Sequence, residues 1–153
     1  MKKNLFYYLF AVICSVALFT SCSDDDDAVK GLTIDNVVGT FTGDLSVLQQ
    51  PIPNTSITVI KVDANTVKVA LKDFKFGELV IGDITANCKA TLDKEDDDFD
   101  LNGQTTLTVA ALGNVELPIV IEGEVDAKEL DIDINITNVP LLNTLKVEFE
   151  GTK

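Results

Sequence analysis

The sequence contains no histidine, no arginine and no tryptophan. Without histidine there is no imidazole to act as a general base near neutral pH, so Ser-His-Asp and Cys-His catalytic sets are excluded. Without arginine there is no guanidinium fork for phosphates or carboxylates. Both tyrosines, Tyr7 and Tyr8, lie at the N-terminus, so phenylalanine supplies the aromatic surface of the rest of the chain. A platform for stacking sugars, which usually needs Trp or Tyr, is therefore disfavoured.

The chain is strongly acidic, with 25 Asp and Glu residues, 12 lysines and a formal net charge of −13. Proteins that bind nucleic acid place clustered Lys and Arg against phosphates, and anionic lipid surfaces attract the same residues. We therefore expect no nucleic-acid partner, and no adhesion to lipid by charge.

The N-terminus has the three parts of a secretory signal. Lys2 and Lys3 give a positive start, positions 5–19 are almost wholly apolar, and Thr20 and Ser21 are small and polar. An apolar run of about 15 residues is shorter than the roughly 20 that a spanning helix needs. Residues 1–21 are therefore predicted to be a signal peptide rather than a transmembrane anchor.

The residues around Cys22 are those of a lipid attachment site. Leu18-Phe19-Thr20-Ser21-Cys22 resembles the lipobox of bacterial lipoproteins, in the tolerant form of Bacteroidetes-type bacteria. The resemblance implies that Cys22 becomes the acylated first residue of the mature chain, because its thiol can take a thioether-linked lipid and several acyl chains anchor stably. A secreted protein with an incidental cysteine stays as the alternative.

An acidic run follows this cysteine directly. Blocks of like charge repel one another and remain solvated, so 22–36 is predicted to be a lipidated, flexible tether. The run also resembles the signal that exports Bacteroidetes-type lipoproteins to the outer face of the outer membrane. We therefore expect a surface-exposed lipoprotein, with the periplasmic face as the alternative. The signal residues are Ser23, Asp24, Asp25, Asp26 and Asp27.

After residue 21 the chain has ample length for one domain with a real core. Apolar and polar residues alternate with a period of two in many segments, most clearly at 129–137 and 144–152, and this alternation is typical of strands. At 66–76 the alternation slips at Asp73, which indicates a β-bulge. Cys88, alone after Cys22 takes lipid, is predicted to be a small buried hydrophobe, with a reactive thiol as the alternative.

About eight strands are expected, separated by compact turns at 63–65, 112–114 and 126–128. Short strands at even spacing predict an all-β fold. Successive hairpins favour a single up-and-down antiparallel barrel over 37–153, because closure removes exposed edges. Polar alternate faces predict a soluble barrel with an apolar interior. A β-sandwich is the alternative.

Five segments carry a family resemblance that covers nearly the whole mature chain. Together they resemble the calycin-like, lipocalin-like domain of Bacteroidetes surface lipoproteins, which implies an eight-stranded barrel but transfers no binding residues. The segments are VVGTFTGDL (37–45), SITVIKVDANTVKVALKDFKFG (56–77), GDITANCKATL (82–92), IEGEVDAKELDIDINIT (121–137) and TLKVEFEGTK (144–153).

The candidate site is the barrel lumen, since eight-stranded barrels are either filled by side chains or hold one small ligand. No cofactor and no metal site is expected. DFDLNG (98–103) matches the start of a calcium loop, but Val109 stands where the bidentate glutamate belongs, so a strand start is favoured. The acidic turn 93–98 is interpreted as a solvated hairpin tip. The candidate lumen residues are Phe41, Phe74, Phe76, Ala86, Cys88, Ala90 and Phe149.

Three functions are compatible with these features. The favoured one is a non-enzymatic binding module for a small apolar ligand or a protein partner, helped by exposed Ile52, Leu141 and Leu142 in the loops 48–54 and 137–143. The second is a structural or accessory subunit of an outer-membrane surface complex. The third, a hydrolase, would need a buried carboxylate pair with raised pKa values.

Overall fold

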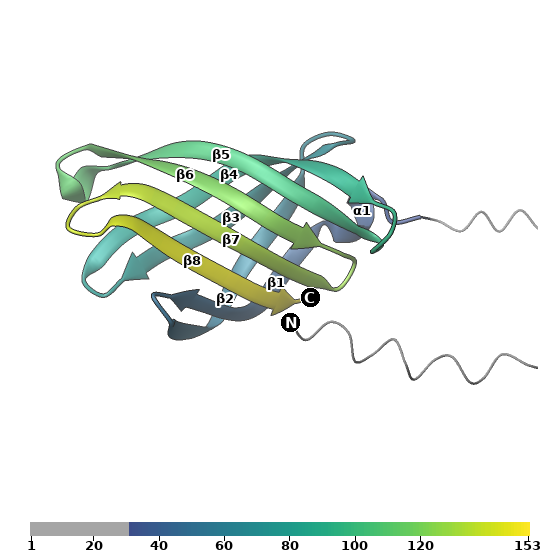
Figure 1. The fold of residues 1–153 in the computed structure, drawn as a ribbon, viewed down its shortest axis with the longest axis horizontal. Helices are drawn as coiled ribbons and strands as arrows, with labels where there is room; N and C mark the ends of the chain where they lie inside the picture. Colours follow the sequence, from purple (N-terminus) through teal and green to yellow (C-terminus); the bar gives the residue numbers. More distant parts are fainter. Residues whose placement is uncertain (1–30) are drawn as a thin grey trace, which may run out of the picture.

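Eight antiparallel strands close into a barrel in the computed structural model, which describes residues 31–153 (Figure 1). Each strand pairs with the next one along the chain, and β8 pairs with β1. The predicted up-and-down barrel of about eight strands is confirmed. The strands are β1 Gly39–Val47, β2 Gln50–Lys61, β3 Thr66–Phe76, β4 Leu79–Asp93, β5 Asp98–Val109, β6 Val115–Val125, β7 Glu129–Val139 and β8 Asn143–Thr152.

The interior of the barrel is apolar, as the alternation predicts. Leu130, Ile132 and Ile134 of β7 all point inward and are buried. Inward side chains from all eight strands join in one hydrophobic core, and no polar or charged residue within 31–153 is buried. In a barrel of eight strands such side chains are enough to fill the lumen.

A short helix, α1 (Ile34–Val37), closes one end of the barrel (Figure 1). Ile34 and Val37 are buried in the core. Lys153 fastens the helix to the C-terminus, because its Nζ donates hydrogen bonds to the carbonyl oxygens of Asn36 (2.6 Å) and Val38 (2.9 Å). Ile34, which lies in the segment 22–36 predicted as a tether, thus packs against the barrel core.

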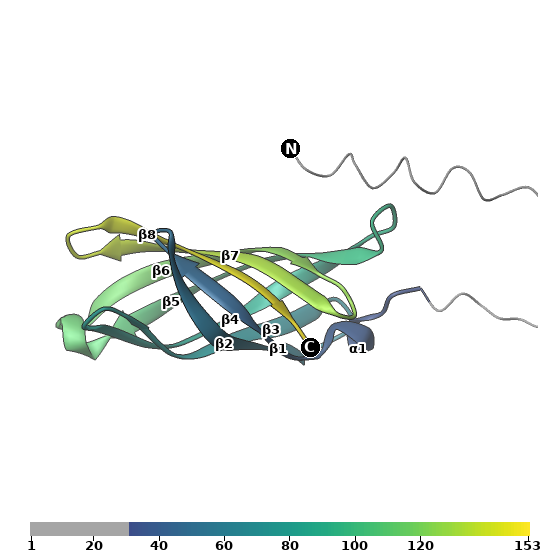
Figure 2. The same ribbon diagram turned by 90° about the horizontal axis from the view of Figure 1, so that it is seen from below.

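The opposite end of the barrel carries four turns, joining β1–β2, β3–β4, β5–β6 and β7–β8 (Figure 2). The β5–β6 turn contains a 3₁₀ helix, η1 (Ala110–Leu112). Among residues 31–153 there is no helix with the length and apolar character needed to cross a membrane.

Both predicted proline-containing loops are shorter than expected. Strand β2 begins at Gln50, so only Leu48 and Gln49 remain as a turn, both left-handed with φ values of 48° and 66°. The β7–β8 turn likewise consists of residues 140–142, because β7 continues to Val139. The loop assignments were wrong because neighbouring strands supply hydrogen-bond partners that local composition does not reveal. The bulge is confirmed, since Asp73 has φ 51° where the β3–β4 register shifts.

Candidate functional site

The barrel wall is incompletely paired around the β3–β4 hairpin. The β2–β3 ladder joins only Ile57–Lys61 to Val67–Leu71. The rest of both strands lies apart, and we call this opening, between Gln50–Ser56 of β2 and Lys72–Phe76 of β3, the β2–β3 seam. The β4–β5 ladder also stops early, at the pair Cys88–Gly103. In both ribbon views the β1–β2 turn stands away from the β3–β4 turn (Figures 1 and 2).

Two features of the sequence open the β2–β3 seam. Val47 and Gln50 close a two-residue turn and form its hydrogen-bonded pair, so the next nitrogen on β2, that of Pro51, faces β3. Pro51 has no N–H to donate across the seam, and Pro53 follows at the same phase. On β3 the bulge at Asp73 bends the strand, and the Asp73 N–H donates to Asp83 Oδ1 (2.9 Å) rather than to a strand partner.

A pocket of about 430 Å³ lies in this seam, within the range of small-molecule sites. Its apolar lining comes from the core residues Leu45, Leu71 and Phe74, all buried, and from half-buried Ile52. The pocket is therefore a place where the hydrophobic core reaches the surface. The other lining residues are polar or charged: Asn54, Thr55, Ser56, Lys72, Asp73 and Lys75.

The opening between β4 and β5 is different in character. It holds a pocket of about 300 Å³ lined mainly by polar side chains, with Ala86 as its one apolar residue. The remaining lining residues are Lys68, Thr85, Asn87, Gln104 and Thr105. Since this pocket lacks a large apolar surface, it is the weaker candidate for an apolar ligand.

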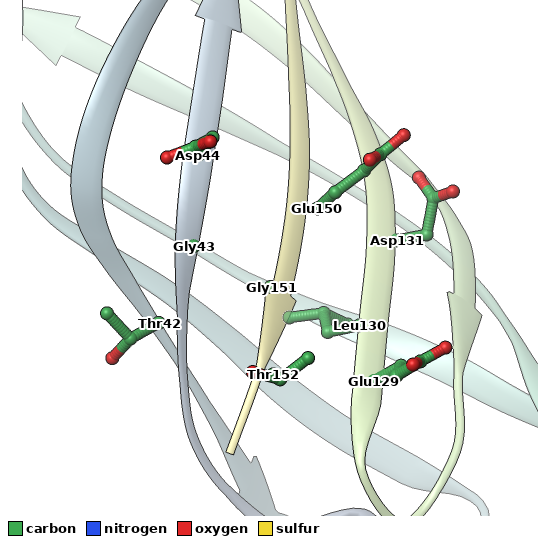
Figure 3. Close-up of a pocket in the computed structure, with 9 residues that line it drawn as sticks. All are labelled: Thr42, Gly43, Asp44, Glu129, Leu130, Asp131, Glu150, Gly151 and Thr152. Atoms are coloured by element: carbon green, nitrogen blue, oxygen red, sulfur yellow. The ribbon is translucent and has the colours of Figure 1, made fainter.

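The far side of the barrel presents carboxylates in register. A row of five, each directly opposite the next, crosses β5, β6, β7, β8 and β1. Directly opposed side chains on neighbouring strands have Cβ atoms about 5 Å apart, and like charges at that spacing repel. Part of this row lines a pocket of about 540 Å³ (Figure 3). The acidic row is Asp100, Glu124, Asp131, Glu150 and Asp44.

In the neighbouring row of outward residues, polar side chains contact the carboxylates. Lys146 Nζ lies 2.6 Å from Glu148 Oε1 and 3.1 Å from Asp133 Oδ2, and these hydrogen bonds raise the pKa of Lys146. Asn102 Nδ2 donates to Glu122 Oε1 (3.1 Å).

Asp98 lies near Asp100 and Glu124, at one end of the acidic row. Partial burial raises the pKa of Asp98, and the nearby Glu124, Asp96 and Asp100 carboxylates raise it further.

The predicted lumen residues all lie in or against the core. Phe41, Phe149 and Cys88 are wholly buried, and Phe74, Ala86 and Ala90 nearly so; only Phe76 is half-buried, near the β3–β4 turn. These side chains help to fill the interior. Burial raises the pKa of the Cys88 thiol to about 11, so the thiol stays protonated at neutral pH.

The structure describes only some of the other predicted sites. Cys22, Ser23 and the aspartates 24–27 lie outside the described residues. The segment 98–103 is regular β5 strand, paired with β4 and β6, rather than a calcium loop. Within 31–153 no cluster of acidic or thiol side chains is arranged to hold a metal ion. No Asp or Glu of that range is buried.

The family model of the calycin-like β-barrel domain matches residues 37–152, about three quarters of the chain. The chain belongs to the calycin-like β-barrel family. Calycin-like barrels are typically binding domains. No curated protein matches the sequence.

A solved structure from Bacteroides fragilis NCTC 9343, a candidate outer membrane protein, has a similar fold. The TM-score is 0.59 at 21% sequence identity, over 80% of this calycin-like chain and 53% of the other. This chain thus spans about half the length of that protein. The likeness supports the fold.

Sequence reasoning missed the β2–β3 seam and the acidic row. The signal for the seam was present in Pro51 and Pro53, which mark an unpaired edge when they fall inside a strand. The acidic row depends on strand register, which turn lengths set and alternation alone does not.

Proposed function

We propose that this protein is a non-enzymatic binding module of the outer membrane surface, and that it takes a small apolar ligand at the β2–β3 seam. The observation that carries the proposal is the pocket where Leu45, Leu71 and Phe74 line an opening to solvent. Apolar pockets with a few polar groups are the usual form of small-molecule sites. Because core side chains occupy the lumen, the seam replaces the lumen as the expected site.

The proposed location of the protein at the outer membrane is inferred from its N-terminal residues. Lipid on Cys22 would anchor the chain, and Ser23 with the aspartates 24–27 would direct it to the outer face. The candidate outer membrane protein with a similar fold supports the same compartment. Incorporation of a labelled fatty acid that is lost in Cys22→Ser tests the anchor. Cleavage by protease added to intact cells tests exposure, and protection from that protease would place the protein on the periplasmic face.

Ligand binding is tested on residues 22–153 carrying Cys22→Ser, a chain that keeps every strand and the helix. Native mass spectrometry of this chain, after incubation with a lipid extract of the native cells, should show a retained apolar compound. Ile52→Asn, which makes the seam pocket more polar without adding charge, should abolish retention. Retention that survives Ile52→Asn would move the site elsewhere, and the absence of any apolar ligand would contradict the proposal.

A structural or accessory subunit of an outer-membrane surface complex is the second candidate. Leu141, in the β7–β8 turn opposite α1, is fully exposed and left-handed (φ 73°), and Leu142 beside it is also exposed. An exposed leucine in a strained backbone conformation, as at Leu141, is typical of contact sites. Pull-down with the lipidated protein, compared with Leu141→Ser, tests this function.

A further inference from the structure

The β2–β3 seam combines its apolar lining with two lysines, in a chain that is otherwise dominated by acidic residues. We propose that the seam binds an aliphatic chain that carries an anionic head group, with Lys72 and Lys75 contacting the head group. The inference rests on the proposed function and specifies the ligand class of that same site.

The apolar part of the pocket suits a flexible hydrocarbon chain. Leu45, Leu71 and Phe74 belong to the core, and Ile52 packs against the core from β2. These side chains supply an apolar surface. An alkyl chain can cover that surface without burying a hydrogen-bonding group of its own.

The charged part of the pocket suits an anion. Neither Lys72 nor Lys75 forms an ion pair with any described residue. Both ammonium groups can therefore donate hydrogen bonds to an anionic ligand. The only acidic lining residue, Asp73, gives the rim two positive charges and one negative. Charge-assisted hydrogen bonds from ammonium to carboxylate or phosphate are stronger than neutral ones.

The main alternative occupant of an open seam is an added β-strand, and the edges disfavour it. Pro51 and Pro53 remove N–H donors from the β2 edge, and lysines on the β3 edge are a common device against strand pairing. The bulge at Asp73 bends the β3 edge away from a regular ladder. These features protect the edges while leaving the side-chain pocket between them open.

Calorimetry with four ten-carbon probes tests the head-group preference, again on residues 22–153 carrying Cys22→Ser. Decanoate and decyl phosphate share the proposed chemistry, and the difference between them separates a fatty-acid source from a phospholipid source. Decanol is neutral and decyltrimethylammonium is cationic. We expect both anionic probes to bind roughly tenfold more tightly than decanol, and the cationic probe to bind most weakly.

A matched pair of double variants tests the two lysines. Lys72→Gln with Lys75→Gln should weaken decanoate binding roughly tenfold and leave decanol binding unchanged. Lys68→Gln with Lys89→Gln makes the same change of charge on β3 and the neighbouring β4, outside the seam pocket, and should alter decanoate binding by less than about twofold. Circular dichroism checks that all variants remain folded.

The outcomes separate the inference from the function beneath it. Equal binding of decanoate and decanol, or equal effects of the two double variants, would overturn the role of the lysines while leaving an apolar site at the seam. Binding of no probe at all would overturn both. Decanoate affinity that survives Ile52→Asn would show that the anion binds outside the seam.

Discussion

Strands β5 to β8 and β1 carry eleven acidic residues and one lysine, whereas β2 to β4 carry five lysines and three acidic residues. We call these the acidic wall and the lysine wall. The acidic wall has long ladders, including one that runs the full length of β6 and nearly all of β5, from Phe99–Val125 to Val109–Val115. The lysine wall contains the β2–β3 seam, two strand prolines and the bulge at Asp73.

The two walls depart from a favourable, regular sheet in different ways. In the acidic wall, carboxylates repel one another across a regular sheet, and the apolar core beneath must outweigh that repulsion. In the lysine wall, the sheet itself is interrupted and the core is reachable from outside. Departures from regular structure tend to gather at functional sites, which is why the proposed site is placed in the lysine wall.

The largest expected difference is in the free energy of unfolding, when a phenylalanine of each wall is replaced by alanine. Phe149 of β8 is fully buried, and its ring packs against Gly151 on the same strand. Phe149→Ala should lower the free energy of unfolding by about 3–5 kcal/mol. Phe74 lines the seam pocket, where neighbours can relax and water can enter, so Phe74→Ala should cost at least about 1 kcal/mol less. Urea denaturation measures both, and equal losses would show that the seam is as tightly packed as the closed wall.

Cys88, where the two walls meet on β4, should make stability depend on alkaline pH. The folded protein holds the thiol proton up to a pKa of about 11, whereas an unfolded thiol loses it near pH 8.5. The folded state thus binds more protons between these values, so stability is complete below about pH 8.5 and falls as pH rises toward 11. The loss should reach about 2–3 kcal/mol.

The Cys88→Ala variant isolates this effect, because lysines also titrate at alkaline pH in both proteins. Its free energy of unfolding should fall less steeply between pH 8.5 and 11 than that of the unmodified chain. Parallel curves for the two proteins would mean that the thiol is not desolvated in solution.

The smallest expected effect has opposite signs in neighbouring rows of the acidic wall. Glu150 stands between Asp44 and Asp131 in the acidic row, so Glu150→Gln should raise stability by about 0.3–1 kcal/mol. Glu148 accepts a hydrogen bond from Lys146, so Glu148→Gln should lower stability by about 0–1 kcal/mol. Thermal unfolding at low salt measures both changes. Both should shrink in 1 M NaCl, and a stabilisation by Glu150→Gln that persisted there would not be electrostatic.

Much of the fold could be predicted from the sequence, because alternation fixes which side chains face inward and turn residues mark where strands end. The segment 129–137 reads as a strand from its residues alone, and the bulge at Asp73 appears as a slip in the pattern. Pairing between strands could not be predicted in the same way, because register and bulges decide which outward residues meet. The β2–β3 seam and the acidic row both depend on that pairing, so they appear only in the structure.

Nuclear magnetic resonance mapping of decanoate on ¹⁵N-labelled protein tests the central claim most directly. We expect amide shifts to concentrate at Ile52, Thr55 and residues 71–75, on both sides of the β2–β3 seam, and to disappear in Ile52→Asn. Shifts centred on Cys88, Ile119 and Ile134 would place the ligand in the lumen and contradict the account.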